Sequence, residues 1–230
     1  MTTPRRVRVL LVGAAGRMGK TIVDLASNDP NIDIVAKCDL GDPIEPAMKN
    51  CDVVIDFSQA DATNEICRTA LHHRKSLVIG TTGHSQEQRL MIENTAQSLP
   101  IVFASNFSVG VSVLFWLTRK AAELLGSDFN PEIIETHHKM KKDAPSGTAK
   151  TLAEIVKRTR NLDSQIPIQS IREGGVVGNH TITFTGPGER LELTHRATNR
   201  EIFARGALRA ACWVIDKPPG LYSMQDVLGL

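Results

Sequence analysis

The chain has 230 residues, and its 27 basic and 25 acidic side chains give a formal net charge of +2 at pH 7. That length suits one large domain or two small ones, and 41% hydrophobic with 23% charged residues is ordinary for a globular protein. A charge this small argues against nucleic acid or an anionic membrane as a partner, and we expect neither.

Cysteine usage and apolar runs bear on the compartment. Four cysteines form no C-x-x-C pair and lie within or beside apolar runs: Cys38, Cys51, Cys67 and Cys212. This pattern is typical of buried free thiols in a reducing compartment, and we predict no metal site. No apolar run approaches the ~20 residues of a membrane span. The opening "MTTPRRVRVLLVG" has basic residues before an apolar run, but that run stops early at glycine without a cleavage site, so we expect a cytoplasmic protein.

Short apolar runs rich in β-branched residues recur in the first half of the chain. We expect strands at 7–13, 33–39, 52–58, 76–83 and 100–106, and amphipathic helices at 17–27, 61–73 and 85–98. Continuous apolar strands that alternate with helices are typical of a parallel sheet covered on both faces. The predicted fold class is therefore α/β, with a Rossmann-type doubly wound parallel sheet.

Beyond about residue 107 the pattern changes to clustered strands with turn signals. We expect strands at 132–138, 166–173, 180–186 and 189–197, and helices over 109–126, from about 147, and over 200–215. This part predicts a smaller α+β domain with an antiparallel or mixed sheet. The last helix can return to the first domain, so the predicted domains are 1–106 with 201–230, and 107–200.

A glycine-rich turn follows the first expected strand. Gly13, Gly16 and Gly19 give G-x-x-G-x-x-G, one residue off the strict dinucleotide fingerprint. Glycine lets the backbone turn tightly and approach a pyrophosphate, which then lies at a helix N-terminus. Asp39 ends the second strand, where a ribose-binding carboxylate belongs. A turn without any ligand is the alternative, but this context favours a nicotinamide dinucleotide.

The form of the dinucleotide stays open. Arg17 and Lys37 lie where they could meet a 2′-phosphate, so the pattern allows NADPH as well as NADH. The segments "GTTG" (80–83) and "ASNFS" (104–108) follow later strands, at the edge where ligands bind in such sheets. Simple strand-ending turns are the alternative for both.

The segment "ETHHKMKKDAPSGTAK" (135–150) concentrates two histidines and four lysines before an expected helix. Pro145 biases Ala144 toward an extended backbone, and Ser146 is a plausible N-cap. The backbone N–H groups of such a helix start form an anion site. Cations are disfavoured at a helix N-terminus, so we expect an anion to offset them.

The side chains just before that helix suit a substrate that carries carboxylates, with one group left as a proton donor. They are His137, His138, Lys139, Lys141 and Lys142. A solvated surface loop is the alternative. The similar run "LHHRK" (71–75) ends an amphipathic helix, where cations complement the dipole, so we interpret it as structural.

The segment "ETHHKMKKDAPSGTA" resembles the signature of the bacterial dihydrodipicolinate reductases, now named 4-hydroxy-tetrahydrodipicolinate reductases. The resemblance extends through "VGAAGRMG", "VVIDFS", "VIGTTG", "FASNFSVGV", "VVGNHTITF", "GERLELTHRATNR" and "FARGALRAACWV", and covers nearly the whole chain. It implies NADH- or NADPH-dependent reduction of 4-hydroxy-tetrahydrodipicolinate, a cyclic dicarboxylate, to tetrahydrodipicolinate in the diaminopimelate route to lysine.

The resemblance also implies residue roles. His137 and Lys141 are similar to the proton donors. The residues that are similar to substrate-carboxylate ligands are His138, Ser146, Gly147 and Thr148. Those similar to cofactor contacts are Gly13, Ala14, Gly16, Arg17, Met18, Asp39, Gly80, Thr81, Thr82, Ala104, Ser105, Asn106 and Phe107, with Arg200 near the expected hinge between a dinucleotide domain and a substrate and oligomerisation domain.

A homotetramer is the expected assembly, because the resembled family associates through the sheets of its second domain. The last strands carry more alternating apolar residues than one face of a small sheet needs: Ile182, Phe184, Leu191 and Leu193. The chain departs from longer relatives after Asp39 and between residues 160 and 172. The first departure leaves the choice between NADH and NADPH open, and the second leaves the details of subunit packing open.

Two other functions compete with this one. Another two-domain dehydrogenase, acting on an amino acid or sugar acid, would share the glycine turn, but the cationic segment fits a dicarboxylate better. A dinucleotide-sensing regulator would be expected to carry a recognition helix or a basic face, and the pattern indicates neither.

Overall fold

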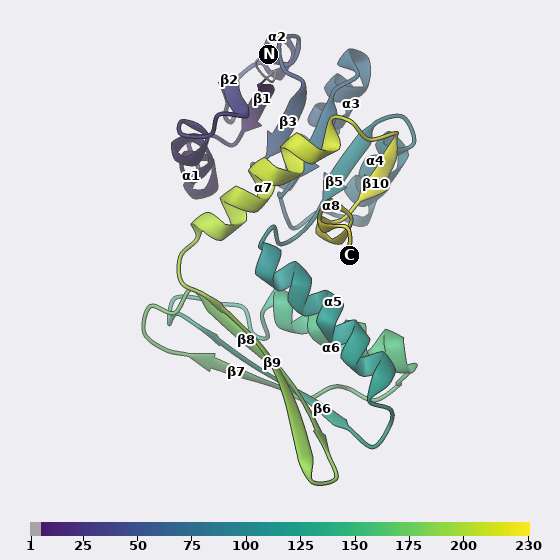
Figure 1. Cartoon of the computed structure of the whole chain (residues 1–230). Helices are drawn as coiled ribbons and strands as arrows, with labels where there is room; N and C mark the ends of the chain where they lie inside the picture. The colour runs from purple at the N-terminus through teal and green to yellow at the C-terminus, as the bar shows by residue number, and fades with distance from the viewer. Residues whose placement is uncertain (1–5) are drawn as a thin grey trace. The chain divides into compact units, whose positions relative to one another are not determined.

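The computed structural model describes residues 6–230. The chain divides into two compact units, one of Met1–Phe107 with Phe203–Gly229, the other of Ser108–Ile202 with Leu230. Figure 1 shows their helices and strands. Among the described residues, no helix is long and apolar enough to cross a membrane.

The first unit is built on a six-stranded parallel sheet with the order β10-β5-β4-β3-β1-β2. The strands are β1 (Val7–Val12), β2 (Ile32–Cys38), β3 (Val53–Asp56), β4 (Ser76–Ile79), β5 (Pro100–Phe103) and β10 (Gly220–Tyr222). In β1, Val9 and Leu11 belong to one apolar cluster and Leu10 and Val12 to another. Because successive side chains point to opposite faces, both faces of the sheet are buried.

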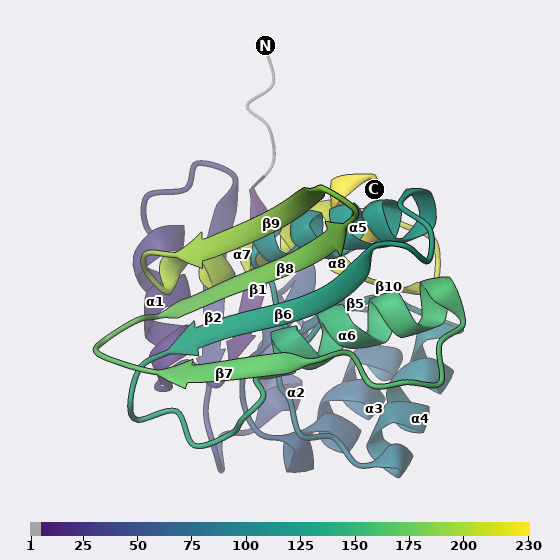
Figure 2. The same cartoon turned by 90° about the horizontal axis from the view of Figure 1, so that it is seen from below.

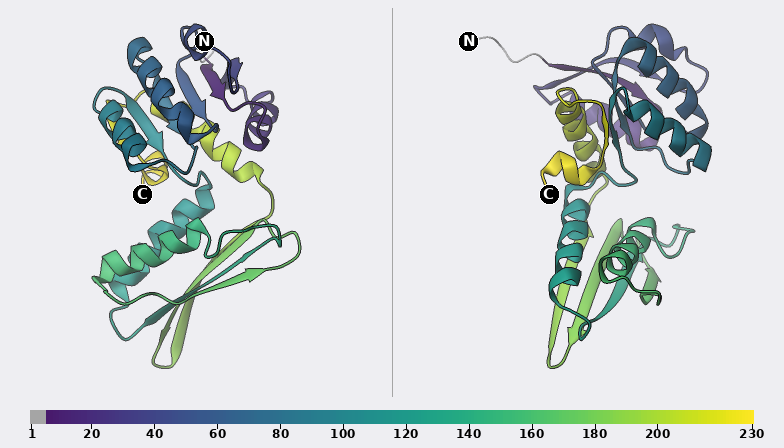
Figure 3. Two further views of the ribbon diagram at one scale, coloured as in Figure 1. Left: turned by 180° about the vertical axis from the view of Figure 1, so that it is seen from behind. Right: turned by 90° about the vertical axis from the view of Figure 1, so that its right-hand side faces the viewer.

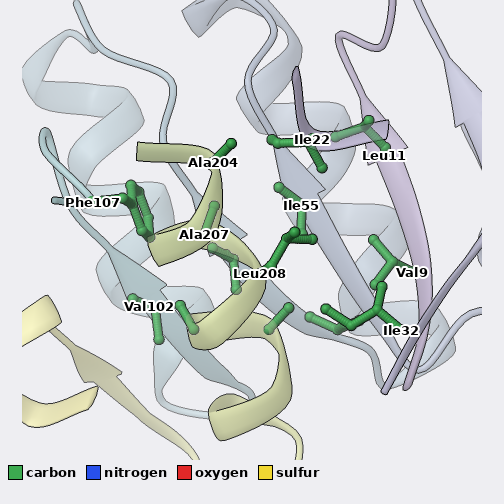
Figure 4. Close-up of a cluster of buried hydrophobic side chains, with 14 of the residues drawn as sticks. Val9, Leu11, Ile22, Ile32, Ile55, Val102, Phe107, Ala204, Ala207 and Leu208 are labelled. Carbon is green, nitrogen blue, oxygen red and sulfur yellow. The ribbon is translucent and has the colours of Figure 1, made fainter. Parts of the chain in front are cut away.

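Helices cover both faces of this sheet. They are α1 (Arg17–Ala26), α2 (Ile44–Met48), α3 (Thr63–His73), α4 (Gln86–Ala96), α7 (Glu201–Val214) and α8 (Met224–Leu228), with a 3₁₀ turn η1 at Ala60–Ala62. In the right-hand view of Figure 3, the yellow C-terminal helices and the blue helices lie on opposite sides of the unit. Figure 4 shows Ala204, Ala207 and Leu208 of α7 packed in the cluster that holds Val9 and Ile55.

The second unit has a mixed four-stranded sheet with the order β7-β6-β8-β9, as seen in Figure 2. Its strands are β6 (Asn130–His137), β7 (Ile168–Arg172), β8 (Gly178–Gly186) and β9 (Glu189–Ala197). β6 pairs with β7 in parallel, and the other two pairs are antiparallel. Helices α5 (Val109–Leu124) and α6 (Gly147–Arg160) share an apolar cluster with this sheet.

The predicted α/β fold class with a second mixed sheet is confirmed. One argument about the second sheet was wrong. Ile182 and Phe184 are fully buried in the unit's own core, and Leu193 packs against the same cluster, so they are not spare apolar surface. Of the four residues named for subunit contact, Leu191 alone is exposed, at 39%.

Cys38, Cys51 and Cys67 are buried and Cys212 is half-buried, and all four are free thiols. Burial raises the pKa of each thiol, that of Cys67 to about 11. The thiols are therefore protonated near neutral pH and serve as small apolar side chains.

Candidate active site

The segment from Glu135 to Ala149, here called the signature segment, runs from the end of β6 to the first turn of α6. His137 is the last residue of β6, and the chain then turns, with the Lys141 N–H bonded to the His138 carbonyl at 3.0 Å. Ser146 caps α6, because its Oγ accepts the N–H of Ala149 at 3.3 Å. The predicted donors and substrate ligands thus lie on one continuous, locally ordered piece of chain.

Glu135 is fully buried, and strand pairing surrounds it with polar side chains. Its neighbour across β8 is His180, and the neighbour of His137 across β7 is Arg172. The Arg172 guanidinium donates to both carboxylate oxygens, at 2.8 and 3.0 Å, and the Ser146 N–H donates to one of them at 3.2 Å. Burial alone would raise the pKa of Glu135, but the hydrogen bonds from Arg172 and His137 outweigh it and lower that pKa to about 2. The carboxylate is therefore ionised.

The imidazole of His137 is held on one side by this carboxylate, to which its Nδ1 is hydrogen-bonded. Its other nitrogen, Nε2, faces Gly178, where a Cβ would lie 3.0 Å away. Burial lowers the pKa of His137, and the charges of Lys141 and Arg172 act in the same direction, while Glu135 opposes them. His137 is thus a group whose protonation near neutral pH depends on its charged neighbours.

A second buried histidine stands next to it. The rings of His137 and His180 meet edge to face, with centroids 5.0 Å apart, and His180 Nε2 lies 3.1 Å from Ser146 Oγ. Burial, followed by the charge of His137, lowers the pKa of His180 to about 4. His180 is therefore neutral at pH 7, and it sits between the helix cap and the His137 ring.

The cationic side of the segment is more exposed. Lys141 Nζ lies 2.8 and 2.9 Å from the two carboxylate oxygens of Asp143, and this hydrogen bond lowers the pKa of Asp143. Arg200 Nη2 lies 3.3 Å from His138 Nε2. Arg200, predicted near the cofactor, thus contacts a predicted substrate residue. The arrangement brings titratable and cationic side chains to one end of α6, an end that favours an anion.

In the first unit, the glycine turn between β1 and α1 has the geometry that a dinucleotide needs. Gly13 has φ +84°, and a Cβ there would overlap the carbonyl of Phe57. The Ala15 N–H donates to both carboxylate oxygens of Asp39, at 2.9 and 3.0 Å. Gly16, the residue before α1, gives no side-chain cap, and the N–H groups of a helix start can bind an anion.

A cavity of about 470 Å³ adjoins this turn. Three of the predicted cofactor residues line it, namely Gly13, Gly16 and Asp39, and so do the acidic side chains of Asp42, Asp61 and Glu65. No Lys or Arg of the described chain lines it. The residues present fit a nicotinamide dinucleotide.

The remaining predicted cofactor residues lie at the carboxyl edge of the same sheet or at the start of α1. Gly80, Thr81 and Thr82 follow β4, and Ala104, Ser105, Asn106 and Phe107 follow β5. Ala14 belongs to the turn, and Arg17 and Met18 begin α1. Thr82 and Ser105 are exposed, whereas the Phe107 side chain is buried in the core (Figure 4), so only its backbone can meet a ligand.

Comparison with known proteins decides the family. The model for the N-terminus of dihydrodipicolinate reductase matches residues 7–107, and the model for its C-terminus matches residues 110–228. The chain belongs to the dihydrodipicolinate reductase family.

Curated relatives in this family carry the name 4-hydroxy-tetrahydrodipicolinate reductase. The one from Akkermansia muciniphila is 47% identical over 97% of this chain and 98% of its own length. The one from Zymomonas mobilis is 42% identical over the whole of both chains. The predicted family is confirmed, and with it the interpretation of the chain as a reductase.

Solved structures agree with the family. Dihydrodipicolinate reductase from Paenisporosarcina sp., solved with dipicolinate bound, superimposes with a TM-score of 0.85 at 26% identity, over 96% of this chain and 98% of that one. Diaminopimelate dehydrogenase from C. glutamicum has a TM-score of 0.60 at 13% identity, over 97% and 93% of the two chains, and shows a shared fold only.

Several residues of this candidate site were missed by the sequence analysis. Glu135 lies on β6, Arg172 on β7, and Gly178 and His180 on β8, and only strand pairing brings them together. A signal for Glu135 existed in the quoted run "ETHH", since a carboxylate two residues from a histidine on a strand shares its face.

Proposed function

We propose that this protein reduces 4-hydroxy-tetrahydrodipicolinate to tetrahydrodipicolinate with a nicotinamide cofactor, in the diaminopimelate route to lysine. Family membership supports the reaction. The observation that carries it is the signature segment, in which the buried Glu135–His137 pair and Lys141 stand beside the N-terminal end of α6. That end suits carboxylates, and the side chains suit proton transfer.

The dicarboxylate substrate is held, in this proposal, by the first turn of α6. Gly147 and Thr148 are its first two residues, and a helix start presents N–H groups and the positive end of the helix dipole to an anion. His138 and the Ser146 hydroxyl complete the set. Ser146 also caps the helix, so its substrate role depends on a hydroxyl that already contacts His180.

The chemistry needs one hydride and one proton, and water is lost from the substrate. When bound, the nicotinamide cofactor supplies the hydride. The substrate then has enamine character, and a ring carbon must take a proton. His137 and Lys141 are the proposed donors, because a bound dianion favours the protonated forms of both side chains.

NADH is the proposed cofactor in preference to NADPH. Asp39, Asp42, Asp61 and Glu65 line the cavity beside the glycine turn. A ribose 2′-hydroxyl can donate to a carboxylate, whereas a 2′-phosphate would bring a second negative group to an acidic wall. Arg17 and Lys37 are exposed and do not line the cavity, so neither offsets that repulsion there.

Domain roles, assembly and location remain proposals. We assign the dinucleotide to the first unit because that unit contains the glycine turn, and the substrate to the second unit because that unit contains the signature segment. The homotetramer is proposed from the family resemblance, with the edge strand β9 as contact, since its side chains are largely exposed. A cytoplasmic location stays a prediction from cysteine usage.

The test is an assay of the purified protein with freshly made substrate, in which the absorbance of reduced nicotinamide is followed. We expect turnover with NADH and a lower dissociation constant for NADH than for NADPH. Turnover of an amino acid or sugar acid instead would favour the other dehydrogenase. Tight cofactor binding without turnover of any of these substrates would favour a regulator.

A further inference from the structure

Glu135 is the most enclosed charged side chain of the signature segment, with no exposed surface. It contacts three other residues, two of them on other elements. Arg172 at the end of β7 holds both its oxygens, the Ser146 N–H at the start of α6 donates to it, and His137 on its own strand is bonded to it through Nδ1. Such a buried carboxylate is costly unless it is fully paired, and these contacts pair both of its oxygens.

We infer that Glu135, held in place by Arg172, is the positioning residue that fixes the His137 imidazole with Nδ1 protonated and Nε2 as its proton-exchanging atom. The inference rests on the proposed function, in which His137 supplies a proton to the substrate. Glu135 itself does not touch the substrate; it acts through the ring.

The assignment of the two nitrogens follows from hydrogen-bond chemistry. An ionised carboxylate only accepts hydrogen bonds, so the ring nitrogen bonded to it must carry a proton. Nδ1 is that nitrogen in His137, which leaves Nε2 to gain and lose the exchangeable proton. Residues two apart on a strand point to the same face, so β6 itself sets the two side chains next to each other.

Arg172 keeps the carboxylate from turning away. Its two-pronged contact with Glu135 fixes the plane of the carboxylate, and the same guanidinium donates to the Asp143 carbonyl at 2.7 Å. Asp143 in turn holds Lys141, the other proposed donor. One arginine thus connects the positioning carboxylate beside His137 with the loop that carries Lys141.

A metal ion is the main competing use of these groups. Glu135, His137 and His180 bring possible ligand atoms within 4.8 Å of one another. Both Glu135 oxygens are already taken by a guanidinium, and a cation there would have to displace the arginine charge. The contacts therefore favour the carboxylate as partner of the histidine.

The charges around His137 give the pH dependence its sign. Glu135 on β6 stabilises the protonated ring, whereas Arg172 on β7, Lys141 in the loop and the burial of the ring oppose it, and the neighbouring His180 on β8 is neutral at pH 7. Loss of Glu135 must therefore lower the pKa of His137. Loss of Arg172 must raise it, because the negative charge of Glu135 is then left without its main partner.

The first experiment needs no variant. Long-range nitrogen–proton NMR of the wild-type protein, with labelled histidine, reports which nitrogen of neutral His137 carries the proton, and His137→Asn assigns the signal. We expect the proton on Nδ1. A proton on Nε2 would overturn the inference. It would also be overturned if added Zn²⁺ displaced Arg172 and shifted the signals of both His137 and His180, because these groups would then bind a metal ion.

The second experiment uses Glu135→Gln, which keeps the size of the side chain and removes its charge, with Glu132→Gln as matched control. Glu132 lies on the same strand but is exposed, and it contacts Arg190 instead. We expect Glu135→Gln to lower kcat about ten- to a hundredfold, the range for loss of the carboxylate partner of a metal-bound histidine, with little change in the substrate KM. The control should keep wild-type kcat.

Opposite pH shifts separate positioning from general damage. We expect the decline of kcat with rising pH, and the NMR titration of His137, to move to lower pH in Glu135→Gln and to higher pH in Arg172→Gln. Shifts of one sign in both variants, or none, would contradict the inference. If the wild-type protein had no reductase activity, the proposed function would fail, whereas the NMR titration would still decide the positioning role.

Discussion

His137 Nε2 faces the backbone of Gly178, and a Cβ on that glycine would lie 3.0 Å from the nitrogen. Contacts this short force the neighbour to shift, and here the neighbour is the proposed donor. We expect Gly178→Ala to lower kcat about tenfold, because even a displacement well under 1 Å misaligns proton transfer. Steady-state kinetics with saturating cofactor measure this.

Gly175→Ala is the control for Gly178→Ala. It adds the same methyl group in the loop before β8, where nothing lies within 4 Å. We expect wild-type kcat in this variant. An equal loss of kcat in both variants would mean that this part of the chain tolerates no extra methyl group. The contact with His137 would then not be the cause of the loss in Gly178→Ala.

Lys141 is the second proposed donor, and the neighbouring lysines provide an internal comparison. Lys139 and Lys142 are exposed, whereas Lys141 is half-buried and bonded to Asp143. We expect Lys141→Ala to reduce kcat by roughly 10²–10⁴-fold, the usual cost of losing a proton donor. Lys142→Ala should keep near-normal kcat. The reverse result would place the donor on the other side of the turn.

Asp39 tests the proposed cofactor preference. Asp39→Asn keeps an acceptor for the Ala15 N–H but removes one negative charge from the cavity. We expect the NADH dissociation constant to rise roughly tenfold, since a hydrogen bond to a charged group is worth about 1.5–3 kcal/mol. The difference between the NADH and NADPH dissociation constants should therefore become smaller. Fluorescence titration at two salt concentrations measures both constants.

Asp24→Asn on the exposed face of α1 is the control for Asp39→Asn. It changes the net charge equally without touching the cavity, so both dissociation constants should stay at wild-type values. Added salt should also reduce the difference between the NADH and NADPH dissociation constants of the wild-type protein, because salt screens the acidic side chains that line the cavity. A wild-type protein that binds NADPH more tightly at low salt would refute the proposed preference.

Sequence patterns predicted the long helices and the apolar strands but missed α2, α8 and β10. The helices at 17–27 and 85–98 have enough turns to show periodicity, whereas α2 and α8 have five residues each and β10 has three. Elements this short take their stability from contacts made elsewhere in the chain, as the fully buried Met48 of α2 illustrates. No local signal encodes such contacts.

The candidate site was predicted only as far as it is continuous in sequence. His137, Lys141 and Ser146 share one segment, but Arg172 and His180 reach it through the pairing of β6 with β7 and β8. Lys139 and Lys142 were named with the other cationic residues before the helix, but both are exposed. The chain turns there, and the Lys141 N–H closes the turn on the His138 carbonyl.

Gly206 of α7 lies against the Phe107 carbonyl so closely that a Cβ there would overlap it. Alanine is favoured over glycine in a helix by about 1 kcal/mol, so propensity alone predicts stabilisation. The overlap is with backbone, which cannot rotate away, and overpacking typically costs about 1–3 kcal/mol. We expect Gly206→Ala to destabilise the first unit by about 2 kcal/mol, measured by urea unfolding through Trp213 fluorescence. Gly175→Ala again serves as the control, and a stabilised Gly206→Ala would show that α7 can move.

His180 should make the second unit sensitive to mild acid. Its pKa is lowered from 6.5 to about 4 in the folded protein, so the unfolded chain binds the proton first as pH falls. The stability that neutral His180 contributes is therefore complete above about pH 6.5 and is lost between pH 6.5 and about 4. The contribution of ionised Glu135, whose pKa is about 2, is lost only below about pH 4.5. By about pH 5, protonation of His180 in the unfolded chain should have lowered the free energy of unfolding by about 2 kcal/mol.

Urea unfolding at neutral pH and at about pH 5 tests this sensitivity, with Trp116 of α5 as the reporter in a Trp213→Phe background. We expect His180→Gln to remove about 2 kcal/mol of the difference between the two pH values, because its side chain stays uncharged. His72→Gln changes an exposed histidine in the first unit and should leave that difference as in the wild type. An unchanged difference in His180→Gln would mean that His180 accepts a proton in the folded protein as readily as in the unfolded chain, and the buried contact with Ser146 would then have to open in acid.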